Sequence, residues 1–508
     1  MLKAMKKGYV YLVGAGPGRA DLITVRGAEV LKKADCIIYD KLANPALLRF
    51  ARADAEIIHV PKRIGKDSAT QNQINKLLLE KAAAGLTVVR LKGGDPCMFG
   101  RVAEELAVLA EAGFDFEIIP GVTAGLAVSS YTGIMLTDRE CSSQVTFVTG
   151  REAEGKQQSN INWPLLAKFN GTLVFYMGMG SLDLISEKLL ENGKSADTPA
   201  AVVCNVSFPT QKTARGTLES ISKACRQQGI EAPAIIIIGA SADGDIRFDW
   251  FAKKPLFGKN IVVTRDAAGN ADFAEKIIAR SGNPVLFETI KIKPNGNITQ
   301  NLKLKTQNLE RYDWVIFTSV NGVAIFFEAM RKIGRDARIF GRAKIAAIGE
   351  RTAEKLAEFG IRADFVPSVF TSEELAEQLV NFSNLQGKKI LLLRSQLASK
   401  ELVESLSKAG ANVEDTAIYT AVPKNGDTSK LIEQIKAGQI DWLTFASPSA
   451  VDAFFKQIDA GLVSTGKIRF ASIGPVTSGA IERLGVRVDV TAQKHTLDGL
   501  LDAMEKKM

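Results

Sequence analysis

The sequence predicts an α/β protein of two halves, each half built from two lobes. A chain of 508 residues is too long for one hydrophobic core, because a domain usually holds about 100 to 200 residues. In the first half, short aliphatic strands alternate with helical patterns, which is typical of α/β architecture. In the second half, three sequence blocks recur in the same order. Two pairs of lobes fit these observations.

We place the boundary between the halves within residues 246–258. This segment passes from polar residues through aromatic ones into Lys-Lys-Pro and a glycine, and a new strand pattern begins at Asn260. The halves are accordingly residues 1–253 and 254–508. Within the first half we expect a break between lobes near residues 120–135.

Composition and hydropathy favour a soluble, cytoplasmic protein. Hydrophobic residues make up 46% of the chain and charged residues 24%, as in globular proteins. The basic N-terminus leads directly into a strand pattern, without an apolar segment of signal-peptide length. The longest aliphatic run, Ile235–Ile238, is far shorter than the roughly 20 residues that span a bilayer. We therefore expect no membrane partner and predict that this run is a buried strand.

Cysteines, histidines and net charge narrow the function further. The five cysteines lie in the first half without metal-clip spacing, and the chain has only two histidines, so we expect neither a disulfide framework nor a metal site. The net charge is +9, with most of the excess in the second half. The basic residues are scattered and no aromatic platform accompanies them, which disfavours nucleic acid and favours a small acidic metabolite.

A glycine-rich turn, GAGPG at 14–18, follows the first strand pattern. A dinucleotide fingerprint would need a third glycine at position 19, where Arg19 stands, and Pro17 lacks a backbone N–H that could bind pyrophosphate. The sequence therefore disfavours NAD. A glycine turn can still bring bare backbone against another ligand, or it can simply connect a strand to a helix, and the residues leave both interpretations open.

A second loop, RLKGGDP at 90–96, ends a later strand pattern. Loops at the carboxyl ends of parallel strands border the crevice of open α/β sheets, and paired glycines let the backbone approach a ligand closely. The segments PGVTA at 120–124 and YMG at 176–178 punctuate strands in the same way. Each motif alone is a weak signal.

In this order and spacing, GAGPG, YDKL (39–42), RLKGGDP, PGVTA, YMG and TPAAVV (198–203) resemble the uroporphyrinogen III C-methyltransferases of the tetrapyrrole methylase family. The resemblance covers about residues 8–251. It implies a two-lobed tetrapyrrole methylase fold, usually homodimeric, that binds S-adenosyl-L-methionine between its lobes and releases S-adenosyl-L-homocysteine. It also implies methylation of uroporphyrinogen III at C2 and then C7 to give precorrin-2. The matching positions place the cofactor near Pro17, Gly93, Gly94, Asp95, Met98, Thr123, Ala124, Met177 and Val206.

The resemblance also assigns the proton transfers, with the proposed acceptor at Asp40 and the proposed donor at Lys62. A pyrrole carbon becomes nucleophilic as its ring nitrogen loses a proton, so a positioned carboxylate suits this chemistry. The residues alone favour other interpretations, in which Asp40 is a cap or loop residue and Lys62 is a solvated charge.

Three positions depart from the family pattern. Family members commonly have an acidic residue at Arg19, a histidine at Asp138, and Glu-Asn-Gly in place of residues 204–206. Asp21 could compensate for the first departure. The other two put local substrate or cofactor contacts in question.

The second half repeats three blocks at nearly constant offsets. Residues 258–265 match 387–394, residues 317–327 match 445–455, and residues 346–365 match 471–490, with offsets of 129, 128 and 125. The repeats predict two similar α/β lobes facing one another across a cleft. A single larger sheet of duplicated units is the alternative.

Four hydroxyl residues occupy repeated positions at expected helix starts. Ser319 matches Ser447, and Thr352 matches Thr477. Backbone N–H groups and a hydroxyl at a helix start can bind carboxylates, although the same residues are also ordinary helix caps.

With Tyr419 in AIYTAVP and HTLDGLL at 495–501, these blocks resemble uroporphyrinogen III synthase over about residues 256–508. The resemblance implies a bilobal α/β fold that closes hydroxymethylbilane into a ring with inversion of ring D, without metal or cofactor. It also implies a two-stranded ladder between lobes, and packing of the N-terminal block of this half with its C-terminal part. By matching, Ser319, Thr352, Tyr419, Ser447 and Thr477 line the cleft, and Tyr419 assists loss of the hydroxyl group. Arg265 and Arg394 are candidate carboxylate partners by charge alone.

The sequence thus predicts consecutive enzymes of siroheme and cobalamin synthesis, with hydroxymethylbilane and uroporphyrinogen III as substrates. Two alternatives stay open. The methylase fold could act on another acceptor, such as RNA or protein, or the duplicated half could be a binding module without catalysis.

Overall fold

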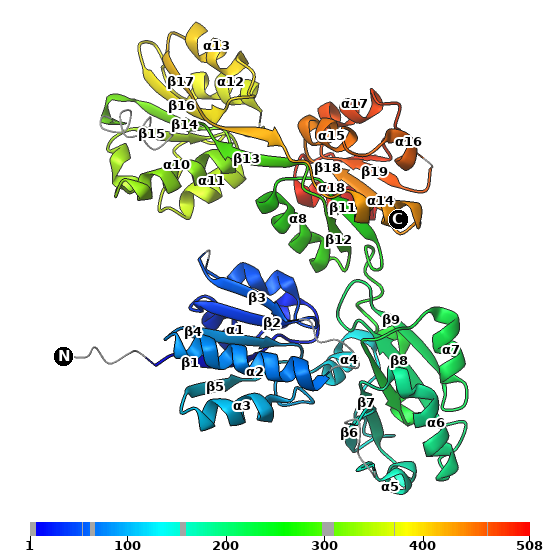
Figure 1. Cartoon of the computed structure of the whole chain (residues 1–508). Coiled ribbons are helices and arrows are strands. Elements are labelled where there is room, and N and C mark those ends of the chain that lie inside the picture. The colour runs from blue at the N-terminus through cyan, green and yellow to red at the C-terminus, as the bar shows by residue number, and fades with distance from the viewer. Residues whose placement is uncertain are drawn as a thin grey trace, which may run out of the picture. The chain divides into compact units, whose positions relative to one another are not determined.

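A computed structural model describes residues 7–52, 54–60, 67–152, 159–296, 309–369, 371–464 and 466–508 (Figure 1). The chain forms two compact units. One comprises Met1–Asn260 with the short segment Ile277–Asn283, and the other comprises Ile261–Lys276 with Pro284–Lys507. The boundary at residue 253 stays a prediction.

The first sheet of the first unit is entirely parallel, with strand order β3-β2-β4-β1-β5. Apolar side chains are buried on both of its faces, as expected for parallel strands covered by helices. Because all five strands run in one direction, their carboxyl-terminal loops lie at one edge. The strands are β1 (Tyr9–Gly14), β2 (Cys36–Asp40), β3 (Glu56–Val60), β4 (Thr87–Lys92) and β5 (Asp115–Ile119), and the helices are α1 (Val25–Leu31), α2 (Asp67–Ala83) and α3 (Val102–Glu111).

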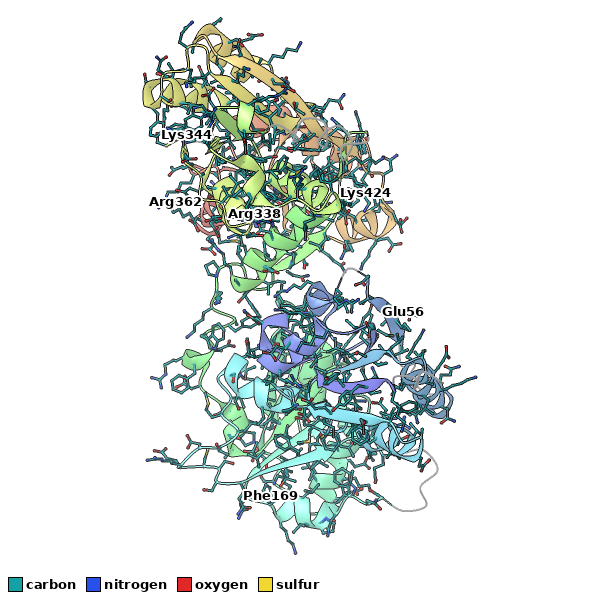
Figure 2. The ribbon with its side chains drawn as sticks, turned by 90° about the vertical axis from the view of Figure 1, so that its left-hand side faces the viewer. Glu56, Phe169, Arg338, Lys344, Arg362 and Lys424 are labelled. Carbon is teal, nitrogen blue, oxygen red and sulfur yellow. The ribbon has the colours of Figure 1, made fainter. Side chains whose placement is uncertain are left out.

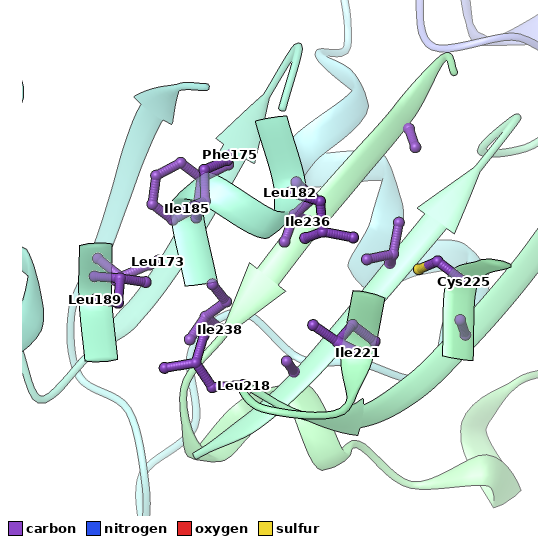
Figure 3. Packing of buried hydrophobic residues seen from close by; sticks show 14 of the residues in the cluster. Leu173, Phe175, Leu182, Ile185, Leu189, Leu218, Ile221, Cys225, Ile236 and Ile238 are labelled. Atoms are coloured by element: carbon purple, nitrogen blue, oxygen red, sulfur yellow. The ribbon is translucent and has the colours of Figure 1, made fainter. Parts of the chain in front are cut away.

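The second sheet of this unit is mixed, with order β6-β7-β10-β8-β9 and β10 antiparallel to both neighbours. The run Ile235–Ile238 lies in β10 and is buried, as predicted. Figure 3 shows Phe175 and Ile236 of this sheet packing with Leu182 and Ile185. The strands are β6 (Val145–Thr149), β7 (Thr172–Tyr176), β8 (Pro199–Cys204), β9 (Lys212–Thr217) and β10 (Ala234–Ile238), and the helices are α4 (Ala124–Thr132), α5 (Trp163–Lys168), α6 (Leu182–Glu191) and α7 (Ile221–Gln228).

The second unit contains two separate sheets rather than one larger sheet, which confirms the prediction of two lobes. Their orders are β12-β11-β18-β19-β20 and β13-β17-β16-β14-β15. The first sheet is made of β11 (Asn260–Val263), β12 (Asn283–Leu286), β18 (Trp442–Phe445), β19 (Arg469–Ser472) and β20 (Val490–Thr491). The second is made of β13 (Ile290–Pro294), β14 (Trp314–Phe317), β15 (Lys344–Ala347), β16 (Lys389–Ser395) and β17 (Asn412–Pro423).

Helices cover these sheets, and basic side chains are spread over their surface. Figure 2 shows Arg338, Lys344 and Arg362, which are exposed and come from three different segments of the second unit. The helices used below are α8 (Ala267–Ala279), α10 (Val320–Lys332), α11 (Glu350–Ala357), α12 (Ser372–Phe382), α13 (Glu401–Lys408), α15 (Pro448–Phe455), α17 (Pro475–Glu482) and α18 (Leu497–Glu505).

The duplicated blocks are exchanged between the lobes. The first sheet takes its first block from the first copy, as β11, and its other two blocks from the second copy, as β18 and β19. The second sheet does the reverse with β16, β14 and β15. Because β11 pairs in parallel with β18, the N-terminal block of this half packs with its C-terminal part, as the resemblance implies.

A two-stranded antiparallel ladder connects the lobes, which confirms another implication of the resemblance. β13 follows β12 of the first sheet and pairs with β17 of the second, from Ile290 opposite Pro423 to Pro294 opposite Tyr419 (Figure 1). Tyr419 therefore lies on the ladder. This position places its side chain where the two lobes connect.

Candidate functional sites

Three glycine loops meet at the carboxyl edge of the parallel sheet. Gly16 and Gly94 exchange backbone hydrogen bonds, with N···O distances of 3.2 and 2.8 Å. A Cβ atom on Gly121 would lie 2.3 Å from the carbonyl oxygen of Gly94 and 2.8 Å from Cα of Gly14. Only glycine allows this approach, because there is no room for a side chain between the three loops.

Asp95 fastens two of these loops together. One carboxylate oxygen accepts a hydrogen bond from the backbone N–H of Cys97 at 2.8 Å, and the other accepts one from Gly121 at 2.9 Å. A carboxylate held by two backbone donors is fixed in orientation. Asp95 therefore shapes the site through the backbone of its neighbours.

Tyr176, at the end of β7, supports the start of α4. Its hydroxyl accepts a hydrogen bond from the backbone N–H of Gly125 and lies 2.9 Å from the hydroxyl of Thr123. Thr123 is the N-cap residue of α4, yet its side chain makes no cap hydrogen bond. The role of Tyr176 was missed from the sequence, although the tyrosine stands inside the YMG motif.

The remaining predicted cofactor residues surround the same region. Met98 and Ala124 pack against the hydrophobic cluster that contains Tyr176 and Val206. Met177 is 52% exposed and has a positive φ of 54°. The structure thus brings most of the predicted cofactor residues together at one edge of the sheet, with Met177 open to solvent.

The loop after β8 contacts the first glycine loop. The hydroxyl of Ser207, which is fully buried, accepts a hydrogen bond from the backbone N–H of Arg19 at 3.1 Å. A Cβ atom on Gly18 would lie 2.6 Å from the ring of Phe208. Pro17 therefore lies in a loop held between the two lobes of the first unit. Ser207 was missed because a lone serine carries no sequence signal.

Asp40 is buried at the carboxyl end of β2, among the loops. Its carboxylate accepts hydrogen bonds from Arg90 at 3.3 Å and from the backbone N–H of Gly93 at 3.4 Å. These contacts explain its burial, since a buried carboxylate needs partners. The other predicted proton-transfer residue, Lys62, lies outside the described residues.

Asp40 is the first member of a network of buried charged side chains. Arg90 also contacts Glu105 at 3.3 Å, and Lys92 donates to both oxygens of Glu105 at 2.9 Å. These three side chains are almost completely buried. The sequence contained a usable signal, because Arg90 and Lys92 are two residues apart in a strand and must share one face.

The positions that depart from the family pattern have local roles. Arg19 donates to Asp21 at 2.9 Å, and this hydrogen bond lowers the pKa of the Asp21 carboxyl. Asp138 accepts from the backbone N–H of Glu140 in a turn. Cys204 ends β8 and is buried.

In the second unit, Tyr419 and Ser319 come together although 100 residues separate them. The phenol donates a hydrogen bond of 2.8 Å to the Ser319 hydroxyl, which also accepts from the backbone N–H of Gly322 as the N-cap of α10. The pKa of Tyr419 is raised, mainly because burial of the phenol disfavours its charged form. The phenol is therefore a neutral hydrogen-bond donor at physiological pH.

The other repeated hydroxyls divide into two kinds. Ser447 is the N-cap of α15 and accepts from Ala450, as Ser319 does in α10. Thr352 and Thr477 are not caps, because Gly349 and Gly474 hold those positions. Both threonines are buried at the third position of their helices. The cap interpretation of the sequence therefore holds for the serines alone.

The two candidate arginines differ sharply. Arg394 is buried and forms a bidentate ion pair with Asp415 at 2.7 and 2.6 Å, and it also donates to the carbonyl of Ser399. Three of its five N–H groups are engaged within the protein and Asp415 balances its charge, so this geometry disfavours the predicted role as a substrate partner. For Arg265, by contrast, the described part of the chain shows no ion pair or hydrogen bond to the guanidinium.

The described residues lack two features. They contain no helix long and apolar enough to cross a membrane. No group of three or more metal-ligating side chains occurs among them.

Two family models match the chain, that of the Tetrapyrrole (Corrin/Porphyrin) Methylases over residues 9–222 and that of Uroporphyrinogen-III synthase HemD over residues 271–502. A porphyrin biosynthesis protein HemD of Ruminiclostridium josui is 36% identical over 503 residues, which are 98% of each chain. An S-adenosyl-L-methionine-dependent uroporphyrinogen III methyltransferase of Methanosarcina barkeri is 44% identical over 46% of this chain and 91% of its own. A solved structure of Uroporphyrin-III C-methyl transferase from Thermus thermophilus, complexed with S-adenyl homocysteine, is 34% identical over 46% of this chain and 93% of that chain, with a TM-score of 0.40.

Proposed function

Because the chain belongs to the family in which a tetrapyrrole methylase is fused to uroporphyrinogen-III synthase, we propose that it catalyses two consecutive reactions. Residues 254–508 cyclise hydroxymethylbilane to uroporphyrinogen III. Residues 1–253 methylate this product at C2 and C7 with S-adenosyl-L-methionine to give precorrin-2 and S-adenosyl-L-homocysteine. The enzyme serves siroheme and cobalamin synthesis in the cytoplasm, as a homodimer formed through the first half.

The observation that carries the proposal is the meeting of the glycine loops beside Asp40. Gly94 has a positive φ of 68°, and a Cβ atom there would lie 3.8 Å from Cα of Thr123, so the two loops present bare backbone to each other at van der Waals distance. The residues therefore fit a cofactor held through main-chain contacts. When bound, S-adenosylmethionine supplies an electrophilic methyl group on a sulfonium.

Within this arrangement, Asp40 acts as the general base. Its carboxylate accepts the pyrrole N–H proton, which makes the ring carbon nucleophilic. Arg90 and the Gly93 N–H fix the carboxylate in place. Orientation of this kind supplies much of the rate enhancement in reactions between two bound partners.

In the second half, the Tyr419 phenol redirects its single proton from the Ser319 hydroxyl to the departing hydroxyl of the bilane, so that the carbon–oxygen bond breaks, water leaves and a phenolate remains. Ser319 holds the phenol in position. Ser447, Thr352 and Thr477 bind carboxylates of the substrate. Folding the bilane into the shape needed for ring closure is the main catalytic contribution.

A two-stage assay of the full chain tests the proposal. With hydroxymethylbilane alone, we expect the type III isomer of uroporphyrinogen rather than the type I isomer that forms without enzyme. With added S-adenosylmethionine, we expect precorrin-2 and two equivalents of S-adenosylhomocysteine. Formation of only the type I isomer would make the second half a binding module. Cyclisation without methylation would assign the first half to another acceptor.

A further inference from the structure

Arg265 and Arg394 occupy the same position in the two copies of the duplicated unit; Arg265 stands two residues after the end of β11, and Arg394 is the last but one residue of β16. In both copies, the strand that carries or precedes the arginine pairs with the next strand in the same register. The Asn283 N–H donates to the Lys259 carbonyl at 2.8 Å, and the Asn412 N–H donates to the Lys388 carbonyl at 2.8 Å. The strand beside each arginine is therefore aligned identically.

This alignment identifies the residue that Arg265 lacks. Asp415, the bidentate partner of Arg394, lies three residues after Asn412. Three residues after Asn283 the chain has Leu286, an apolar side chain that is 55% exposed. The internal carboxylate that neutralises one arginine is thus replaced by leucine beside the other.

Two carboxylates, Asp266 and Asp272, lie near Arg265, but neither forms an ion pair with its guanidinium among the described residues. The Arg265 side chain packs on Gly269 in the first turn of α8, where a Cβ atom would lie 2.8 Å from its Nε. Because the start of a helix carries a partial positive charge, it does not offset the charge of the arginine. Of the two nearby acids, Asp266 accepts from the Gly269 N–H and Asp272 pairs with Arg351. Arg351, on α11 of the other lobe, is also close to Arg265, but its charge is paired with that of Asp272.

An unsatisfied donor lies beside the arginine. The side chain of Asn270 is buried and its oxygen accepts from the Arg265 backbone N–H at 2.7 Å. Its amide nitrogen has no hydrogen-bond partner among the described residues. The Arg265 guanidinium and the Asn270 amide are therefore two neighbouring donors, one charged and one neutral, that can bind an anion from outside the chain.

We propose that Arg265 is a carboxylate anchor for a polycarboxylate tetrapyrrole in the second half, available because Leu286 stands where the duplicated unit otherwise carries its internal acid. The inference rests on the proposed function for the identity of the ligand. The anchor lies near two residues of the predicted cleft. Asp266, next to Arg265 in the chain, acts electrostatically on the Tyr419 phenol, and Arg351 precedes Thr352.

The decisive variant restores the missing acid. In Leu286→Asp, an aspartate next to Arg265 reproduces the pair seen at Arg394 and competes with the ligand. We expect the KM for hydroxymethylbilane and the Kd for uroporphyrin III to rise about tenfold, the loss typical of one charged hydrogen bond. Leu286→Asn, which has the same shape without the charge, should change both constants less than twofold.

A double-mutant cycle supplies the second measurement. In an Arg265→Gln background, Leu286→Asp should have no further effect on uroporphyrin III binding, because the arginine it neutralises is gone. Equal Kd values for Leu286→Asp and Leu286→Asn would overturn the inference, as would a full chain that does not bind uroporphyrin III. If the binding difference appears but no variant cyclises hydroxymethylbilane, the anchor stands and the proposed reaction fails.

Discussion

The hydroxyl of Ser319 accepts hydrogen bonds from both the phenol of Tyr419 and the backbone N–H of Gly322. One serine thus caps α10 and positions a residue of the ladder. Ser447 caps α15 in the same manner, but its other hydrogen-bonding neighbour is Ser449. The duplicated unit therefore provides a natural control for the tyrosine contact.

We expect Ser319→Ala and Ser447→Ala to lower the free energy of unfolding by a similar amount, about 1 kcal/mol each, because each removes one helix cap. Only Ser319→Ala should also release the Tyr419 phenol and lower kcat for hydroxymethylbilane. Urea unfolding and initial-rate measurements on both variants separate the two effects. Equal kcat values would show that the hydrogen bond has no role in catalysis.

Tyr419→Phe should lower kcat for cyclisation about tenfold to a hundredfold without abolishing it. The variant removes the proton donor, whereas the folding of the bilane by the rest of the cleft is retained. Steady-state kinetics with isomer analysis measure the change. Activity identical to that of the parent would remove Tyr419 from the site.

Asp40→Asn should slow methylation about a hundredfold or more while leaving the affinity for S-adenosylhomocysteine nearly unchanged. The amide cannot accept the pyrrole proton, but it keeps the shape of the carboxylate. Asp115→Asn, at the opposite end of the parallel sheet, is the matched control. Calorimetric binding and single-turnover methylation give the two quantities, and full turnover by Asp40→Asn would exclude the base role.

The sequence predicted the α/β architecture, the two sheets of the second unit and the ladder, and both family resemblances are confirmed. The repeat pattern alone could not predict the exchange of blocks between the lobes; only the family resemblance implied that the N-terminal block of this half packs with its C-terminal part. Repeat offsets record that segments are alike, but β11 lies between β12, its neighbour in sequence, and β18 from the second copy. Such pairing leaves no mark in the spacing of the blocks.

Within the sites, sequence patterns located loops better than they assigned roles. The glycine motifs were placed correctly, yet Asp95 binds backbone N–H groups and Tyr176 supports α4. Arg265 and Arg394 looked equivalent in sequence, and only the neighbouring strand distinguishes them. The Asp95–Gly121 contact joins residues 26 positions apart and the Tyr176–Gly125 contact joins residues 51 positions apart, and no local pattern encodes such contacts.

Tyr176→Phe should weaken binding of S-adenosylhomocysteine several-fold and cost about 1 to 2 kcal/mol of stability. The change removes the acceptor of the Gly125 N–H and the partner of the buried Thr123 hydroxyl. Tyr131→Phe is a suitable control, because that buried ring packs against Trp250 and Phe251. Calorimetry and thermal unfolding of both variants test the assignment, which equal affinities would contradict.

Asp415→Asn should destabilise the second unit by about 2 kcal/mol. The substitution removes the charge that compensates the buried Arg394, and a buried charge without its partner is costly, although the partial exposure of Asp415 lets water offset some of the loss. Leu286→Asn at the equivalent strand position should change stability by no more than about 0.5 kcal/mol, because no ion pair exists there to lose. Urea unfolding monitored by tryptophan fluorescence can compare them, since Trp314 and Trp442 are buried in the two sheets of this unit. Equal midpoints for the two variants would mean that the Arg394 pair contributes nothing to the fold, and that the contrast between the two arginines has no energetic basis.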